Sequence, residues 1–338
     1  MLDAPPTAHI GGDRAVVSDL LAILPGYAGR PVSWWRDLPW TVTRSGESLL
    51  LTLDHLREEL MIDRANRERV LACGAVIENL RLAAHHHGAE LDVASWPEGV
   101  ASSMVARLTL GAPLVARREE EALFGVLSRP DHPAVRDVGG AASPALLAVL
   151  RHAARSEGGW LDVVTDDARR MLVADLESEA EVIANAERGA RRILQSGDVA
   201  SRGSARLVVG GGPTLAELLA TLGANVQPSS EWTTSREWTA RGSTMDAPIL
   251  AVLGAGDDTP VGWLRAGTAL QRVLLHASVQ GLRASFLNAP LLHPLLRDAM
   301  RAILFPVGTP HAIIRFDFEA TDASRTPGRL GVRSASAA

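Results

Sequence analysis

The sequence predicts an α+β fold made of two related halves within one chain. Two observations support this prediction. Segments with the apolar spacing of helices alternate with short apolar runs that are typical of strands, and one helical stretch occurs twice. Residues 74–88 (GAVIENLRLAAHHHG) align without a gap on residues 267–281 (GTALQRVLLHASVQG), at an offset of 193 residues. Because such a repeat indicates duplicated structural units, we expect one central helix in each half.

The second copy of the repeat has the clearer helix signals. Thr259 suits the N-cap position and Pro260 suits the first helical turn. Apolar residues then recur at helical spacing, and Gly281 follows as a stop signal. Four aligned pairs are identical: Gly74/Gly267, Leu82/Leu275, Ala84/Ala277 and Gly88/Gly281.

The first half is predicted to span residues 13–115, after a disordered N-terminus over residues 1–12. It begins with an amphipathic helix that ends at Pro25-Gly26, followed by an irregular tryptophan-rich connection. Alternating apolar residues predict the strands, and Asp63 is expected to cap the central helix. The predicted helices span residues 13–24 and 63–87, and the predicted strands span residues 41–43, 49–53, 90–94 and 105–110.

The second half is predicted to span residues 116–318, with an irregular insertion or lid at 196–245 and a C-terminal tail at 319–338. A charged segment from Arg117 begins its first helix. Residues 248–253 are continuously apolar, which is typical of a strand buried on both faces. Further helices are predicted at 144–156, 166–194, 259–280 and 293–303, further strands at 161–165 and 311–318, and a loop at 284–290.

Composition excludes several classes of function. The chain has 338 residues and a formal net charge of −5, which argues against nucleic acid as a partner. No apolar run reaches the length of a membrane span, so we expect a cytoplasmic protein without membrane contact. All 34 basic residues are arginine, which removes Schiff-base chemistry and the P-loop lysine. The single Cys73 excludes an internal disulfide.

Four local patterns have both a functional and a structural interpretation. Three successive helical histidines, His85 to His87, point in different directions and fit a helix C-terminus better than a metal site. The segment 210–217 could bind phosphate, but its Thr and Glu also form a capping box. Asp257 and Asp258 could bind a metal, although they also suit the turn before a helix. The arginines of the segment 128–137 could bind a phosphate, or the segment could form a solvated loop.

Two stretches carry a resemblance to a known family. Residues 256–275, GDDTPVGWLRAGTALQRVLL, and residues 72–84, ACGAVIENLRLAA, resemble the Acg-like branch of the FMN-dependent nitroreductase superfamily. Members of that branch contain two nitroreductase-like halves in one chain, which imitate a homodimer. The resemblance therefore implies a nitroreductase-like pseudo-dimer, present as a monomer or a homodimer. It also implies FMN in a cleft between the halves.

The resemblance also suggests cofactor-binding residues, although several family positions have changed. In residues 31–40, Ser33, Pro39 and Trp40 match the family, whereas Trp35, Arg36 and Leu38 replace its polar residues. In the loop after the second central helix, Ser285 and Pro290 match, but Ala289 and Leu292 replace a Gln and a Glu. The residues expected to bind FMN are Arg30, Ser33, Asn79, Arg129, Arg136, Ser285 and Asn288.

Three functions follow from these observations as hypotheses. In the first, the protein is an FMN-dependent oxidoreductase that passes electrons from a nicotinamide cofactor to a small planar acceptor. In the second, it holds FMN or another planar ligand without turnover, with Trp232 and Trp238 of the insertion covering the ligand. In the third, the flavin site is lost and the fold binds another ligand or a protein.

Overall fold

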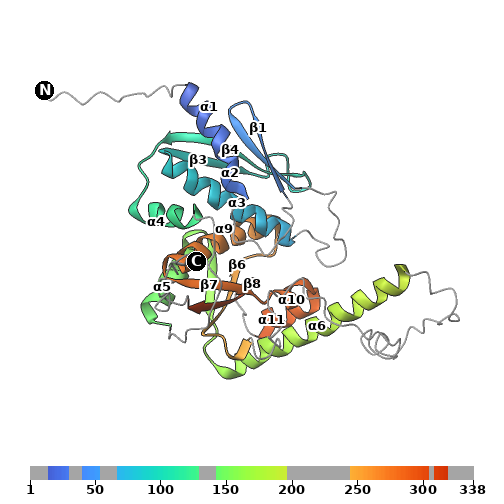
Figure 1. Ribbon diagram of the computed structural model, residues 1–338. Coiled ribbons are helices and arrows are strands. Elements are labelled where there is room, and N and C mark those ends of the chain that lie inside the picture. The colour runs from blue at the N-terminus through green and yellow to red at the C-terminus, as the bar shows by residue number, and fades with distance from the viewer. Residues whose placement is uncertain are drawn as a thin grey trace, which may run out of the picture.

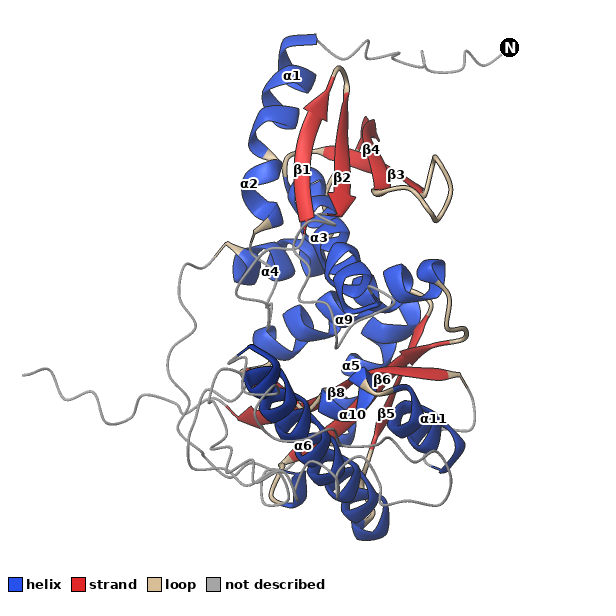
Figure 2. Cartoon of the chain, turned by 90° about the vertical axis from the view of Figure 1, so that its right-hand side faces the viewer, coloured by secondary structure: helices blue, strands red, loops and turns tan. Residues whose placement is uncertain are grey.

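The computed structural model of the chain describes residues 14–29, 40–53, 67–128, 142–195, 244–303 and 308–318. These residues form two four-stranded antiparallel sheets and the helices that pack on them, so the predicted α+β class is confirmed. Figures 1 and 2 show the sheets on opposite sides of two central helices, α3 (Arg67–His86) and α9 (Pro260–Val279). Residues 1–12, 30–39, 196–243 and 319–338 lie outside the described residues, as does Asp63.

The first sheet has the strand order β1-β2-β4-β3. A two-residue turn joins β1 to β2, and Gly46 in this turn has a φ of 60°, which favours glycine. Helices α2 and α4 contact α3, and α1 contacts α2. The elements are α1 (Arg14–Ile23), α2 (Pro25–Ala28), β1 (Trp40–Ser45), β2 (Ser48–Leu53), β3 (Ala89–Ser95), β4 (Met104–Pro113) and α4 (Arg118–Leu127).

The second sheet has the order β5-β6-β8-β7. Its elements are α5 (Pro144–Ser156), β5 (Gly159–Val163), α6 (Asp167–Gln195), β6 (Ile249–Ala255), β7 (Leu282–Phe286), α10 (Ala289–Leu292), α11 (Pro294–Ile303) and β8 (Thr309–Phe318). The loop predicted at 284–290 is therefore wrong in part, because residues 282–286 pair with β8 and residues 289–292 are helical.

The two sheets correspond strand for strand when they are read in chain order. Both ends of α9 lie 193 residues after the corresponding ends of α3, which is the offset of the sequence repeat. Strand β7 likewise begins 193 residues after the start of β3. The connections that differ are those between β1 and β2 and between β3 and β4. At the corresponding places the second half contains α6, and then α10 with α11.

These added helices explain why the sheets differ in burial. Strand β2 alternates between half-buried and buried residues, which is typical of a sheet with one covered face. Strand β6 is buried at every position. A second apolar cluster lies on its other face, where Val252 and Ile313 of the sheet pack with Val173 of α6 and Met300 of α11. The continuous apolar pattern predicted for residues 248–253 is therefore confirmed as a strand buried on both faces.

Helices α3 and α9 pack against each other through their glycines. A Cβ atom on Gly74 would overlap Leu264 O of α9, and a Cβ atom on Gly267 would overlap Leu71 O of α3. Only glycine allows the two backbones to approach so closely. The largest apolar cluster is continuous across this contact, and it includes Val76 and Leu80 from one half and Leu270 and Val273 from the other.

Candidate functional site

Polar groups from both halves meet where the first turn of α3 contacts β8 and α10. Arg67 Nη1 donates to His311 O at 3.1 Å, and Arg67 Nη2 donates to Leu291 O at 3.1 Å. The same guanidinium pairs with Glu68 Oε1 at 2.8 Å. We call this region, comprising Arg67, Glu68, Asn288, Leu291 and His311, the α3–β8 junction.

Charged residues are unusually buried in this first turn of α3. Arg67 and Glu68 are each 2% exposed, and Arg69 is 9% exposed. Arginine and glutamate are almost never this buried without partners, because desolvation of a charge is costly. The contacts of Arg67 to two carbonyl groups and a carboxylate offset that cost. These contacts tie the start of a first-half helix to the backbone of the second half.

His311 occupies an irregular position in β8. Leu253 of β6 pairs with Ala312 and Gly254 pairs with Pro310, so His311 is the extra residue of a β-bulge. Bulges redirect side chains and often lie beside functional sites. The side chain is fully buried, and its Nε2 lies 3.4 Å from Asp257 O. Because a carbonyl oxygen only accepts hydrogen bonds, this contact places the imidazole proton on Nε2.

The other imidazole nitrogen of His311 is therefore a buried acceptor. Its Nδ1 has no hydrogen-bond partner within the part of the chain that the structure describes. Burial lowers the pKa of His311 to about 4, and the Arg67 guanidinium acts in the same direction while Asp258 opposes it. His311 is consequently neutral near pH 7, and its Nδ1 carries a lone pair that can accept a hydrogen bond from a ligand.

Asn288 supplies a buried donor in the same junction. Its Oδ1 accepts a hydrogen bond from Ile313 N of β8 at 2.8 Å, which fixes the orientation of the amide. Its Nδ2 then points elsewhere, and no described residue accepts from it. Leu291 N donates to Asn288 O at 2.9 Å, so the residue also begins α10. The sequence predicts that Asn288 binds a cofactor, and the structure gives it one structural contact and one open donor.

Asp257 and Asp258 shape the turn before α9. Thr259 Oγ1 donates to Asp257 Oδ1 at 2.6 Å, and Trp263 Nε1 donates to Asp258 Oδ1 at 2.6 Å. Arg297 of α11 pairs with Asp258 Oδ2 at 3.0 Å. Within the described ranges, no group of three or more His, Cys, Asp or Glu side chains is arranged to hold a metal ion. Both carboxylates therefore have structural partners.

Asn79, the predicted cofactor residue on α3, lies between the two central helices. Its Oδ1 accepts from Gln271 Nε2 of α9 at 2.8 Å, and both residues are fully buried. The neighbouring Glu78 pairs with Arg272 Nη1 at 3.0 Å and also with Arg81. Burial raises the pKa of Glu78, although these two arginines oppose the shift. These contacts place Asn79 in helix pairing, and its flavin role stays a prediction.

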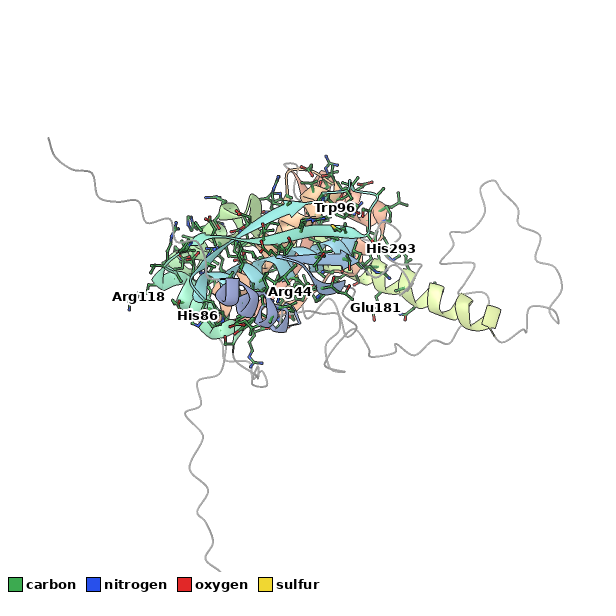
Figure 3. The ribbon with its side chains drawn as sticks, turned by 90° about the horizontal axis from the view of Figure 1, so that it is seen from above. Arg44, His86, Trp96, Arg118, Glu181 and His293 are labelled. Carbon is green, nitrogen blue, oxygen red and sulfur yellow. The ribbon has the colours of Figure 1, made fainter. Side chains whose placement is uncertain are left out.

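The histidines at the end of α3 contact helix α4. His85 Nδ1 lies 3.0 Å from Glu120 Oε1, and His86 Nδ1 lies 2.9 Å from Glu121 Oε2. The His86 ring also stacks on Phe124 with a centroid distance of 3.8 Å. Figure 3 shows His86 on the left of the view and His293, which follows α10, farther to the right, on the side from which α6 extends. The histidine cluster and the α3–β8 junction are therefore separate, at opposite ends of α3.

The described structure does not bring the remaining predicted site residues together at one place. Ser285 is exposed on the edge strand β7, where it pairs in register with Arg315 of β8. Of the predicted residues that the structure describes, only Asn288 belongs to the α3–β8 junction. The other predicted positions lie outside the described residues, namely Arg30, Ser33, Arg129, Arg136, residues 210–217, Trp232 and Trp238.

Sequence reasoning misses Arg67 and His311. Arg67 stands in a polar run of a predicted helix, and nothing in that run indicates burial. His311 offers a weak signal, because it is a polar residue directly before the apolar run 312–314 of β8. A lone histidine of this kind is more often a core residue than a ligand, and the bulge that directs it depends on pairing with β6.

Comparison with known protein families gives no match, and no curated protein sequence matches the chain. None of the described helices combines the length and the apolar character that crossing a bilayer requires.

Proposed function

We propose that this protein is a nitroreductase-like FMN-binding oxidoreductase, in which two related halves imitate a homodimer within one chain. The single observation that supports this proposal best is the reciprocal packing of α3 and α9. Gly74 of α3 lies against Leu264, and its repeat partner Gly267 lies against Leu71, which is the counterpart of Leu264 in the first half. Each half thus presents the same surface to the other, as in a two-fold symmetric dimer.

The polar contacts between the central helices follow the same reciprocity. At the offset of the repeat, Glu78 corresponds to Gln271 and Asn79 corresponds to Arg272. The Glu78–Arg272 ion pair and the Asn79–Gln271 hydrogen bond are therefore equivalent contacts. One is ionic and the other is neutral, so the two halves have diverged while the pairing geometry has been retained. This reciprocity agrees with the twin-domain organisation that the resemblance implies.

One described residue, Asn288, supports a contact with the polar edge of FMN. Asn288 Nδ2 is a buried donor without a described partner, and the flavin ring carries carbonyl oxygens that can accept from it. Ser285 lies on β7, the strand that leads to Asn288. The phosphate would be held by the predicted arginines Arg30, Arg129 and Arg136. When bound, FMN supplies the hydride and electron transfer.

The protein's own contribution to this chemistry is placement. Arg67 holds β8 and α10 together by donating to His311 O and Leu291 O. The hydrogen bond from Ile313 N fixes the amide of Asn288, so its donor is preorganised.

The visible absorption spectrum of the purified protein tests the proposal. We expect the two bands of oxidised flavin, either as purified or after FMN is added. Addition of NADPH or NADH should then bleach them. Bound flavin that neither nucleotide bleaches would instead support the hypothesis of a non-catalytic flavin-binding protein. A protein that binds no FMN at high micromolar concentration would contradict both functions.

The phosphate contact can be tested separately. Because a hydrogen bond to a charged group contributes about 1.5–3 kcal/mol, Arg129→Ala should weaken FMN binding by about ten- to a hundredfold. The same variant should leave the affinity for riboflavin, which has no phosphate, unchanged. Arg107→Ala, which changes an exposed arginine of β4, is the matched control. An unaltered FMN affinity in Arg129→Ala would remove Arg129 from the phosphate role.

A further inference from the structure

Helix α6 extends beyond the part of the protein on which it packs. It contacts α10 and α11, and the residues buried in its first half are Val173, Ala174, Glu177 and Ala180. None of residues 181–186 is buried, although the helix continues to Gln195. Figures 1 and 3 show this second part of α6 running past α10 and α11, away from the sheets. The packing of α6 on the described elements is therefore concentrated in its first half.

The second part of α6 is rich in apolar residues. Val182 is half exposed, and the sequence adds Ile183, Ile193 and Leu194 to the same part of the helix. A helix of about four turns is only marginally stable in water unless its apolar face packs on a partner. The projecting part of α6 therefore needs a partner for its apolar residues.

Charge is segregated along α6. From Met171 to Glu187 the sequence contains five acidic residues and no basic residue. The acidic side chains of Glu179 and Glu181 are exposed, on either side of Val182. The last eight residues of the helix contain three arginines and no acidic residue. An acidic and apolar surface is thus followed by a basic and apolar segment on the same helix.

The two segments are complementary in charge but cannot meet within one molecule. At 1.5 Å per residue, Glu181 and Arg192 lie about 17 Å apart along the axis of one continuous helix. A straight helix cannot fold back on itself, so the complementary surface must come from another helix. The α6 helix of a second copy supplies it when the two helices run antiparallel, whereas a parallel pair would place like charges together.

We propose that α6 is a dimerisation element, and that two copies of the protein associate through antiparallel pairing of their α6 helices. The acidic segment of each copy faces the arginines of the other, and the apolar residues around Val182 are buried between the helices. This pairing is two-fold symmetric, so every contact occurs twice. The inference goes beyond the proposed function, because it uses no residue that is expected to bind FMN.

The periodicity of the helix agrees with this pairing. At 100° per residue, positions 188 and 192 fall on the same side of Val182 as position 181. A two-fold axis between antiparallel helices brings the same side of each helix together. Glu181 of one copy is therefore directed toward Arg188 and Arg192 of the other.

Two charge-reversed variants test the pairing. Glu181→Arg makes both segments basic, and the double variant Arg188→Glu/Arg192→Glu makes both segments acidic. Each variant alone should dimerise at least about tenfold more weakly than the wild type, because both contacts become repulsive. An equimolar mixture of the two should form heterodimers, because each contact then joins opposite charges. Glu47→Arg, which reverses an exposed charge in the turn between β1 and β2, is the matched control and should dimerise as the wild type.

The apolar contact is tested in the same way. Val182→Asp should weaken the dimer, whereas Val100→Asp, which changes another half-exposed valine far from α6 in the sequence, should not. Sedimentation velocity of the full chain between about 1 and 100 μM measures the monomer–dimer equilibrium, because a small interface of this kind is expected to be weak. Native mass spectrometry detects the heterodimer in the mixture.

Three results would overturn the inference. The first is a wild type that stays monomeric over this range, which would show that the apolar face of α6 is covered within one chain. The second is a dimer that neither charge-reversed variant weakens, which would place the interface elsewhere. The third is a mixture that forms no heterodimers. FMN binding is measured separately, so a dimeric protein that binds no FMN would contradict the proposed function alone, and a monomeric one that binds FMN would contradict this inference alone.

Discussion

Replacement of the buried His311 by glutamine should remove much of the acid sensitivity of the fold. The folded state holds His311 neutral, with a pKa lowered from 6.5 to about 4 by burial and by Arg67. In the unfolded chain the imidazole takes up a proton near its ordinary pKa. A group whose pKa is depressed by folding contributes stability above the unfolded pKa, and that contribution is lost as the pH falls toward the folded pKa.

The size of the effect follows from the two pKa values. A difference of one between the folded and unfolded pKa values corresponds to about 1.4 kcal/mol of stability. Most of the resulting change in stability occurs between about pH 7.5 and about pH 4.5. The His311 contribution to the free energy of unfolding should therefore fall by about 2.5 kcal/mol over this range. Glutamine does not titrate and retains a donor for Asp257 O. The pH dependence of His311→Gln should accordingly be flatter than that of the wild type by this amount.

Urea unfolding followed by tryptophan fluorescence at several pH values measures the difference. The quantity to compare is the change in unfolding free energy with pH in the wild type and in His311→Gln, because other groups contribute equally to both. His152→Gln controls for the general effect of removing one imidazole. Parallel pH profiles for the wild type and His311→Gln would refute the argument that His311 is buried in the neutral form.

Two further predictions concern the helix contact and a buried carboxyl. Gly74→Ala places a Cβ against the backbone of α9 and should destabilise the protein by about 2–3 kcal/mol in urea unfolding. Gly125→Ala, which has open space around its Cβ, is the control and should be neutral or stabilising. A tolerated Gly74→Ala would contradict the close packing of α3 and α9. Glu177 of α6 is 6% exposed, and burial together with Glu181 raises its pKa to about 8. The pKa of Glu177 in the folded state lies above its value of 4.5 in the unfolded chain. The free energy of unfolding should therefore fall, by an amount on the order of 4 kcal/mol, as the pH rises from 4.5 to 8. Glu177→Gln should abolish this fall. Identical unfolding free energies of the wild type and Glu177→Gln at pH 8.5 would show that the carboxyl is solvated.

The helix boundaries could be predicted from the sequence because their signals are local. Thr259 Oγ1 accepts from Gly262 N at 3.1 Å, as expected for a cap three residues away. Ser143 caps α5 in the same manner, with Leu146 N donating to its Oγ at 3.1 Å. Gly281 has a φ of 72°, which explains why it ends the second copy of the repeat. Each of these contacts joins residues that are close in the chain.

The candidate site could be predicted only in part, because its contacts are not local. Asn288 is among the predicted cofactor residues, but the partner of its side chain, Ile313, lies 25 residues away. The predicted loop at 284–290 is wrong in part because β7 is defined by pairing with β8 and has only five residues of its own. A short strand without strong alternation carries too little pattern to be distinguished from a loop.

Local signals in the chain are sufficient to specify the α+β class, both ends of α9, the C-terminal end of α3 and the internal repeat. These features depend on side-chain spacing, caps and glycines that act within a few residues. Packing alone establishes that Arg67 reaches His311 O, 244 residues away, and that His311 becomes the extra residue of a bulge. Both outcomes depend on the register between distant segments. Burial then sets the protonation state of His311, and burial is a property of the packed molecule and not of any stretch of the chain.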